Sequence, residues 1–259
     1  MGGWWSHMRQ AVAALALGSE LVATQACGTD AVRWESEERS TLQNAESWRP
    51  FALPSTPTIC PGSLVSVRAR GDTVFAAWWT PQRDSSSRVV VARSDDRGHA
   101  WRDAVVADST DRARWGCARP PPFLAADSLN GYVHVVYFLV APEGPGVFLT
   151  HSMEGGTMFH EPVPIVYGER PSVASVASRG DTVAVAYEDP NASAPQIWLA
   201  LSRSTGHIFD ERMSVSSANV SSTHPAVAFR GRRVTVTWIE TARNGGPVST
   251  MIRTGTIRE

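Results

Sequence analysis

The sequence carries no excess of charge of either sign. Lys and Arg number 24, Asp and Glu number 25, and the formal net charge is −1. Proteins that bind nucleic acid or an anionic surface usually carry a basic patch or a run of like charges, and none occurs here. The composition therefore argues against nucleic acid as a partner. Any association with a membrane would have to come from a lipid anchor.

The sequence also lacks the short motifs of cofactor-dependent enzymes and of common hydrolases. It contains no G-x-G-x-x-G, no phosphate-binding loop and no G-x-S-x-G nucleophile elbow, so no cofactor is expected. The 7 histidines are scattered, and His160-Glu161 is not followed by a second histidine at the spacing of a zinc-protease motif. No metal site is expected.

No stretch of the chain is apolar enough to cross a bilayer, but the N-terminus has the pattern of a targeting segment. Arg9 precedes the short apolar run Ala11–Gly18, and small residues follow up to Cys27. We expect a signal segment over residues 1–27 and a linker over residues 28–40. Three readings stay open: a bacterial envelope lipoprotein with its lipid on Cys27, a freely secreted protein, or a cytoplasmic protein with a disordered leader.

The feature that is present in abundance is an internal repeat. Four copies of one pattern occur at intervals of 50 to 58 residues, and each pairs a small polar residue with a glycine or alanine and then an aromatic residue. The copies are Thr41-x-Gln43-x-Ala45-x-x-Trp48, Ser94-x-Asp96-x-Gly98-x-x-Trp101, Ser152-x-Glu154-x-Gly156-x-x-Phe159 and Ser202-x-Ser204-x-Gly206-x-x-Phe209. A fixed period of this length is the mark of a repeat architecture.

Each copy lies between two runs rich in β-branched and aromatic residues, and a further pair of such runs precedes it. The runs 73–79, 132–139, 182–188 and 233–239 each follow a Gly-Asp, Asn-Gly or Gly-Arg turn. No amphipathic helical stretch separates them. The sequence therefore predicts an all-β protein made of four-stranded antiparallel units of about 50 residues.

The pattern S-x-D-x-G-x-x-W resembles the Asp box, or BNR repeat, of sialidase-like β-propellers. The resemblance covers most of residues 41–259 and implies that each copy forms the turn between the third and fourth strands of a blade. In such a turn the Ser and Asp side chains bond backbone groups, the glycine takes a positive φ and the aromatic residue fills the blade. The motif is structural, so it indicates a propeller and not catalysis.

We expect a small β-propeller of about four blades, closed by N- and C-terminal strands. The last unit ends where its fourth strand should begin, and the segment Trp48–Leu53 looks like that missing strand, so we expect it to pair near Val248–Arg253. Sialidases of this family have six blades. A fragment, or two chains that pair into a larger ring, therefore remains an alternative to a complete ring of four.

The blade topology predicts which residues gather on one face. We name the strands of a blade A to D from the inside outward. The A–B and C–D turns share one face, and the B–C and D–A loops share the other, where propeller ligands usually bind. Cys60 and Cys117 precede the A strands of adjacent units on this face, which predicts a Cys60–Cys117 disulfide in an exported protein.

We expect the same face to carry the residues that bind a ligand or catalyse a reaction. Arg119 and Arg170 occupy equivalent positions before A strands and could bind a carboxylate, as the arginines of sialidases do. The candidates for catalysis are Tyr187, Glu188, Asp189 and Glu240, since sialidases use a Tyr nucleophile with acidic partners. Sialidases use a third arginine and an aspartate in an acid loop, and this sequence has neither at the matching positions. Each of the six candidate residues could instead have a structural role, as a charged loop residue or as an aromatic residue of the core.

The sequence thus leaves three functions open. The first is an exported propeller that binds a glycan or an envelope or extracellular protein, with catalysis unproven. The second is an exo-sialidase or related glycoside hydrolase. The third is a structural interaction module of the cell envelope. The oligomeric state and the ligand are not specified by any pattern in the chain.

Overall fold

The computed structural model describes residues 31–40, 58–242 and 246–258, and within them every regular element is a β-strand. The predicted signal segment, the copy of the repeat over residues 41–48 and the segment Trp48–Leu53 lie outside the described residues. No helix of the described part is long and apolar enough to cross a membrane.

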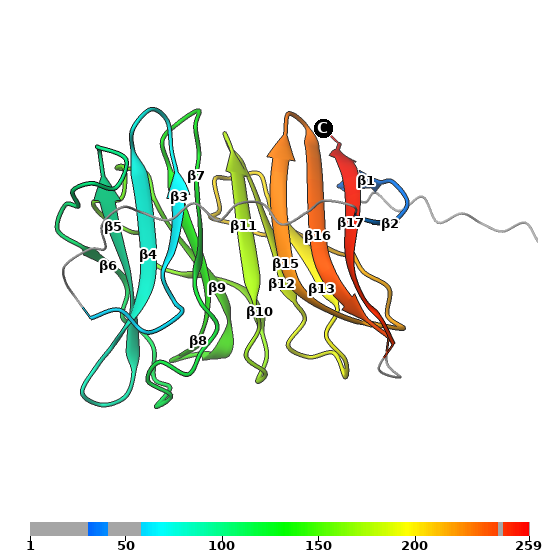
Figure 1. Cartoon of the computed structure of the whole chain (residues 1–259), viewed down its shortest axis with the longest axis horizontal. Helices are drawn as coiled ribbons and strands as arrows, with labels where there is room; N and C mark the ends of the chain where they lie inside the picture. Colours follow the sequence, from blue (N-terminus) through cyan, green and yellow to red (C-terminus); the bar gives the residue numbers. More distant parts are fainter. Residues whose placement is uncertain (1–30, 41–57, 243–245, 259) are drawn as a thin grey trace, which may run out of the picture.

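The strands form four antiparallel sheets, which we call blades 1 to 4 in chain order (Figure 1). Blade 1 contains β3 (Val65–Arg68), β4 (Val74–Pro81), β5 (Ser87–Ser94) and β6 (Val105–Asp108). Blade 2 contains β7 (Phe123–Ala126), β8 (Val133–Ala141), β9 (Gly144–Ser152) and β10 (Val163–Tyr167). Blade 3 contains β11 (Ala174–Arg179), β12 (Thr182–Glu188), β13 (Ile197–Ser202) and β14 (Glu211–Ser214). Blade 4 contains β15 (Ser221–Arg230), β16 (Arg233–Thr241), β17 (Val248–Ile257), β1 (Val32–Trp34) and β2 (Glu38–Arg39). The predicted all-β propeller of four blades is confirmed.

The second strand of each blade shows how the blades stack. In β4, β8 and β12 nearly every residue is buried, because both faces of these strands are covered. In β16 buried residues alternate with more exposed ones, as in a strand with one face on a core and one in water. Blade 4 is therefore covered on one face only.

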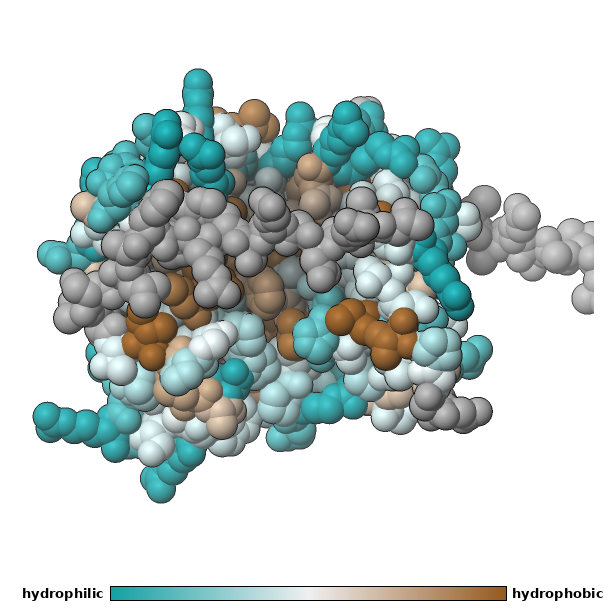
Figure 2. All heavy atoms as spheres, viewed as in Figure 1, coloured by the Kyte–Doolittle hydropathy of each residue, from teal (hydrophilic) through white to brown (hydrophobic). Residues whose placement is uncertain are grey.

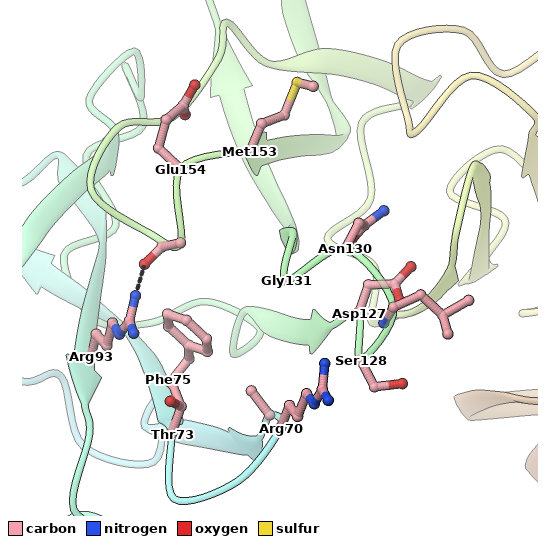
Figure 3. A pocket seen from close by; sticks show the side chains of 13 residues that line it. Arg70, Thr73, Phe75, Arg93, Asp127, Ser128, Asn130, Gly131, Met153 and Glu154 are labelled. Atoms are coloured by element: carbon pink, nitrogen blue, oxygen red, sulfur yellow. Dashed lines mark hydrogen bonds between the residues drawn. The ribbon is translucent and has the colours of Figure 1, made fainter.

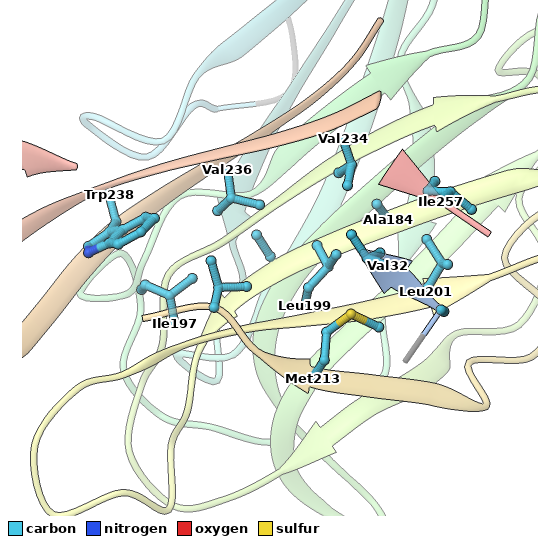
Figure 4. Packing of buried hydrophobic residues seen from close by; sticks show 13 residues of the cluster. Val32, Ala184, Ile197, Leu199, Leu201, Met213, Val234, Val236, Trp238 and Ile257 are labelled. Atoms are coloured by element: carbon cyan, nitrogen blue, oxygen red, sulfur yellow. The ribbon is translucent and has the colours of Figure 1, made fainter. Parts of the chain in front are cut away.

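Three apolar cores lie between successive blades. One joins blades 1 and 2, one joins blades 2 and 3, and one joins blades 3 and 4. Figure 4 shows the last of these, where Leu199 and Leu201 of β13 face Val234 and Val236 of β16. A fourth, smaller cluster covers the outer face of blade 1 with residues of its own loops, including Trp101. Among the described residues, no core joins blade 4 to blade 1.

The four blades consequently form an open arc. The A strands β3, β7, β11 and β15 follow one another in a row, each packed beside the next, whereas β15 and β3 are not packed together in the described part (Figure 1). In the same view, Figure 2 shows hydrophilic side chains along the upper and lower edges and hydrophobic patches between them. The predicted closure into a ring is not seen in these residues.

The two ends of the chain do pair, but through other residues than expected. Val32–Trp34 pairs with Gly255–Ile257 of β17, and Glu38–Arg39 pairs with Met251 and Ile252. Val32 is 1% exposed and belongs to the core between blades 3 and 4. Residues 32–39, which we expected to be a linker, thus form the outer strand of blade 4. They occupy the β17 edge that the sequence analysis assigned to Trp48–Leu53.

Candidate functional site

Three turns with one geometry lie between the third and fourth strands of blades 1, 2 and 3. In each turn a fully buried serine hydroxyl accepts a hydrogen bond from the backbone N–H of the glycine four residues on, at 2.8 to 3.1 Å. The three glycines have φ of +84 to +94°, a conformation that residues with a Cβ rarely adopt. The serines are Ser94, Ser152 and Ser202, and the glycines are Gly98, Gly156 and Gly206.

The side chains inside these turns differ in what they add. The Asp96 carboxylate accepts from the Ala100 N–H at 2.8 Å and from the Ser94 hydroxyl at 2.7 Å, whereas Glu154 makes no side-chain hydrogen bond in the described part. Ser204 accepts from the Ile208 N–H at 3.1 Å. The aromatic residues Trp101, Phe159 and Phe209 pack against three different cores. The repeat residues therefore stabilise turns and blade contacts.

The turns lie on the face that the topology predicts. The Arg97 N–H donates to the carbonyl of Asp72 in the A–B turn of blade 1, and the Thr205 N–H donates to the carbonyl of Asp181 in blade 3. These bonds place the A–B and C–D turns together. We call this the turn face, and we call the opposite end, with the B–C and D–A loops, the loop face.

On the loop face, Cys60 and Cys117 are joined by the predicted disulfide, with Cα atoms 5.3 Å apart. It links the segment before β3 to the loop before β7, so it ties blade 1 to blade 2. The sequence separation of 57 residues makes this a long covalent loop.

Arg119 lies close to this disulfide in the chain, but it is not available to a ligand. Its side chain is 0% exposed, and Nη1 lies 2.9 Å from Oδ2 of Asp111, whose side chain is 1% exposed. The contact is an ion pair without hydrogen-bond alignment, because neither Nη1 nor Nη2 has a hydrogen-bond partner. Its guanidinium also lies over the Trp79 ring, 4.7 Å from the centroid. Burial lowers the pKa of Arg119 from its ordinary value, and the charge of Asp111 partly offsets that effect.

The other proposed ligand, Arg170, does not join Arg119. It is half-buried, and its Nη2 donates to the backbone carbonyl of Asp189 at 2.6 Å. Within the described part of the chain, the polar and ring contacts of Arg119 are with blade 1 and the loop that follows it. The expectation that the two guanidiniums form one carboxylate site is therefore wrong for Arg119, and Arg170 is held by a backbone group.

The catalytic candidates are also held in structural contacts. Tyr187 is 3% exposed in the core between blades 2 and 3, and burial raises its pKa to about 12. Glu188, on the same strand, accepts from the His224 N–H at 2.8 Å. Asp189 caps the loop by accepting from the Asn191 N–H at 2.9 Å. Glu240 lies on β16 of blade 4, where its negative charge helps to raise the pKa of Glu37, although burial is the main cause of that shift.

A tyrosine and carboxylate pair that the sequence analysis missed joins blades 1 and 2. The Tyr137 hydroxyl donates to Oδ2 of Asp108 at 2.6 Å, and both residues are buried. Burial and the negative charge of Asp108 raise the pKa of Tyr137 well above its ordinary value. Because the Tyr137 phenol is fully buried and keeps its proton, its role is to join the two blades. Only the packing of blade 1 against blade 2 could have indicated it.

A pocket of ≈ 420 Å³ opens on the turn face between blades 1 and 2 (Figure 3). We call it the interblade pocket. Ala69, Phe75, Leu129 and Met153 contribute apolar surface to it, and most of the other lining side chains are polar or charged. Two of them, the guanidinium of Arg70 and the carboxylate of Glu154, are exposed and make no ion pair or hydrogen bond with described residues. Arg93 is engaged, since it donates to the Gly155 carbonyl at 3.3 Å and pairs with Asp95 at 2.8 Å.

A second hollow, of ≈ 360 Å³, lies on the loop face between Tyr167, Glu143 and Asn191. Its amide is already used, because Nδ2 of Asn191 donates to the Tyr167 carbonyl at 2.8 Å. The face on which we expected the ligand therefore has a pocket, but none of the predicted site residues lines it.

Three of the histidines lie together in space, although the sequence predicts no metal site. His151, His160 and His207 each offer one ring nitrogen to a group whose atoms lie within 4.8 Å of one another. The group lies on the turn face, where His151 and His160 flank the blade 2 turn and His207 follows Gly206 in the blade 3 turn. No short-range spacing in the sequence indicates this group, because His207 comes from a different blade than His151 and His160.

Comparison with known proteins identifies the fold. No protein-family model matches the sequence, and no curated protein matches it. Among solved structures, the Hadza microbial sialidase Hz136 matches with a TM-score of 0.53 and 16% identity, over 73% of this chain and 43% of that one. A protein of unknown function from Dyadobacter fermentans matches with a TM-score of 0.53 and 17% identity, over 72% of this chain and 50% of that one. An exo-1,5-alpha-L-arabinanase from a bovine ruminal metagenomic library matches less well, with a TM-score of 0.48 and 12% identity over 78% of this chain and 79% of that one.

The likeness to the first two structures concerns the fold, which is a β-propeller. The chain spans half or less of the length of the first two of these structures. At identities this low the likeness concerns the backbone arrangement, and the chemistry of any site has to be argued from this chain's own residues.

Proposed function

We propose that this chain is an exported, sialidase-like Asp-box propeller that binds an uncharged glycan in the interblade pocket and does not cleave it. The observation that carries the proposal is the pair of unengaged groups, Arg70 and Glu154, in a pocket of ≈ 420 Å³. Binding sites for small ligands are concave, have about this size, and combine apolar surface with a few polar groups.

The charges of the pocket favour a neutral sugar over an acidic one. Arg70 and Arg93 contribute positive charge, but Arg93 is paired with Asp95, and Asp127 and Glu154 contribute carboxylates. An added carboxylate would therefore meet as much negative as positive charge and gain no net attraction. Sugar hydroxyls both donate and accept, so they can satisfy a guanidinium and a carboxylate at once. Phe75 and Met153 offer apolar contact to the sugar ring.

The engagement of the catalytic candidates supports a role without catalysis. A carboxylate-binding arginine must be open to solvent, and Arg119 is buried against Asp111. A tyrosine nucleophile needs a base that lowers its barrier to ionisation, whereas burial raises the pKa of Tyr187. The three serine turns fit the Asp box, which adds stability to the blades. Export, as the N-terminal segment predicts, would bring the pocket to extracellular or envelope glycans.

Two measurements on the purified full chain test the proposal. The first is binding of fluorescently labelled protein to a printed array of neutral and sialylated glycans, and we expect signals from neutral glycans that Arg70→Ala and Glu154→Ala reduce. Arg68→Ala is the matched control, because Arg68 is exposed on the same part of blade 1 but does not line the pocket. The second is release of fluorophore from a 4-methylumbelliferyl sialoside, and we expect none.

The outcomes separate the alternatives. Turnover of the sialoside would show that the protein is a glycosidase and would refute the proposal that it binds glycans without cleaving them. An array without signal would refute glycan binding and favour a protein-interaction module. Equal loss of signal in Arg68→Ala and Arg70→Ala would show that the glycan binds elsewhere.

A further inference from the structure

Three histidine rings from two blades meet on the turn face. His151 ends the third strand of blade 2, His160 follows the turn, and the His160 N–H donates to the His151 carbonyl at 2.9 Å. This backbone bond fixes the two residues side by side, and their rings stack with centroids 4.6 Å apart. His207, from the blade 3 turn, meets the His151 ring edge-on at 4.4 Å.

The nitrogen atoms of this cluster lack partners. His151 is 1% exposed, and neither Nδ1 nor Nε2 has a hydrogen bond, while Nε2 of His160 is also buried and unpaired. Buried polar atoms in native proteins are nearly always paired, so each exception needs an explanation such as a bound ion or water. Three unpaired imidazole nitrogens in one place indicate a common occupant.

The hydrogen bonding of His207 favours the tautomer in which Nε2 has a free lone pair. Its Nδ1 lies 2.7 Å from the Ser204 carbonyl oxygen, which can only accept, and 2.9 Å from the Thr205 hydroxyl. Because that hydroxyl donates its proton to the Ser204 carbonyl at 2.6 Å, Nδ1 carries the proton of the ring. Nε2 is then the nitrogen with the lone pair. Metal-binding histidines commonly donate their other ring N–H to a backbone carbonyl in this way, which fixes the orientation of the ring.

Imidazole binds a metal ion through the lone pair of an unprotonated ring nitrogen. A fourth ring, His134, stacks on His151 at 5.7 Å but donates its Nε2 proton to the Thr205 carbonyl at 3.0 Å, so it borders the cluster. Asp127 contributes negative charge beside His134.

We propose that His151, His160 and His207 bind a Zn²⁺ ion that links blades 2 and 3, with water in the fourth position on the exposed His207 side. Neutral imidazoles suit zinc, whereas Ca²⁺ and Mg²⁺ prefer oxygen ligands. Three histidines and a water form a known zinc coordination pattern. With Zn–N bonds of about 2.0–2.1 Å, tetrahedral ligands lie roughly 3.3 Å apart, so the group of 4.8 Å contracts as the ion binds.

Contraction requires little movement of the fold. His207 is exposed and lies in a turn, whereas His151 is buried in β9. The exposed ring can therefore approach the buried one while the backbone bond keeps His160 in place. An ion held from both sides would join two turns that otherwise belong to separate sheets, and it would stabilise the folded chain in proportion to its affinity and concentration.

The test is a zinc titration of the tag-free full chain after treatment with a chelator. We expect isothermal titration calorimetry to show one Zn²⁺ per chain and thermal melting to shift upward with zinc. His207→Ala should lower the affinity at least about tenfold, since even loss of a residue that only orients a ligand costs 10–100-fold. His207 is exposed, so this variant should fold, and an unchanged circular dichroism spectrum checks that it does.

His99→Ala is the matched control. His99 follows Gly98 in the blade 1 turn as His207 follows Gly206 in blade 3, but it is not part of the cluster. The His99→Ala variant should bind zinc with the same affinity as the parent. The His160→Ala variant should lose affinity for zinc as His207→Ala does. Replacement of zinc by Co²⁺ should give the visible absorption of a four-coordinate ion in the parent and lose it in His207→Ala. A parent that binds no zinc, or a His207→Ala variant that binds as tightly as His99→Ala, would overturn the proposal.

Discussion

The guanidinium of Arg119 lies 2.9 Å from the carboxylate of Asp111, and the two side chains are almost completely buried. The pair sits in the loop that connects blade 1 to blade 2, next to the Cys60–Cys117 disulfide in the chain. Oδ2 of Asp111 also accepts from the Ser87 N–H at 2.9 Å. Arg and Asp are usually found at the protein surface, but these two residues form a buried ion pair on the loop face.

Arg119→Ala should therefore be strongly destabilising. Removal of one partner leaves Asp111 buried without its counter-charge, and such losses cost about 3–5 kcal/mol. Arg170→Ala, which removes one hydrogen bond from a half-buried side chain, should cost about 0.5–1.5 kcal/mol. Urea unfolding of both variants measures the difference. Equal, small effects would show that Arg119 is more accessible than the structure indicates.

The disulfide should contribute strongly to stability. In the chain-entropy model, closing a loop with a sequence separation of 57 residues stabilises the fold by about 4 kcal/mol. We expect the midpoint of denaturant unfolding to fall when a reductant is added. The double variant Cys60→Ala/Cys117→Ala is the control, because its unfolding should not respond to reductant. A parent protein that is equally stable in reductant would contradict the assignment.

The three buried serines of the turns should each matter for stability. Replacement of Ser94, Ser152 or Ser202 by alanine leaves the glycine N–H of its turn unpaired, at a cost of about 1–3 kcal/mol each. Ser217→Ala, at an exposed residue, should change stability by less than about 0.5 kcal/mol. Chemical unfolding of the four variants tests this. Losses no larger than that of Ser217→Ala would mean that water replaces the serine hydroxyl.

Asp96 should give the blade 1 turn a pH-dependent contribution. Hydrogen bonds from the Ala100 N–H and the Ser94 hydroxyl lower the pKa of Asp96 below its ordinary value of 3.8. A carboxyl group whose pKa is lower in the folded state stabilises the fold above its unfolded pKa, and this effect is lost as the pH falls through the folded pKa. Asp96→Asn should thus be less stable than the parent at pH 7, and the difference should shrink below about pH 4.

Thermal melting from pH 7 to pH 3 measures this difference. The control is Glu154→Gln at the equivalent position of blade 2, where the carboxylate makes no hydrogen bond with the described residues. Its difference from the parent should be small across the range. A difference for Asp96→Asn that persists unchanged at pH 3 would exclude the charge as its source.

Val32 tests whether the N-terminal strand belongs to the fold. Val32→Ala removes two buried methyl groups from the core between blades 3 and 4, which should cost roughly 2 kcal/mol. Arg33→Ala, at the exposed neighbour on the same strand, should change stability little. Equal stability of Val32→Ala and the parent in urea would indicate that β1 is not held against β17.

The turns and strands of this protein were predictable because their causes are local. Ser94, Asp96 and Gly98 lie within five residues, and their side-chain chemistry sets the turn wherever the blade is placed. The disulfide followed from topology, since Cys60 and Cys117 hold equivalent places before two A strands. The candidate site was not predictable in this way. Arg70 and Glu154 belong to different blades, and although Glu154 stands at the Asp position of the repeat, no spacing in the sequence links it to Arg70.

A strand-like composition does not by itself decide which segment pairs with the edge of β17. The segment Trp48–Leu53 has the composition of a strand, but residues 32–39 occupy the edge of β17. Val32 can enter the core between blades 3 and 4, and the choice between the two segments depends on that packing.

The sequence by itself determined the all-β class, the period of the blades and the serine turns, because these depend on residue spacing within one unit. It also determined the pairing of the two cysteines, because they hold equivalent places in adjacent units. Only the tertiary structure decided that the blades form an open arc, that Arg119 faces Asp111, and that three histidines meet. Those outcomes depend on how one sheet is rotated against the next. That rotation is set by the fit of whole core faces, such as Leu199 against Val236, and no short pattern in the chain encodes it.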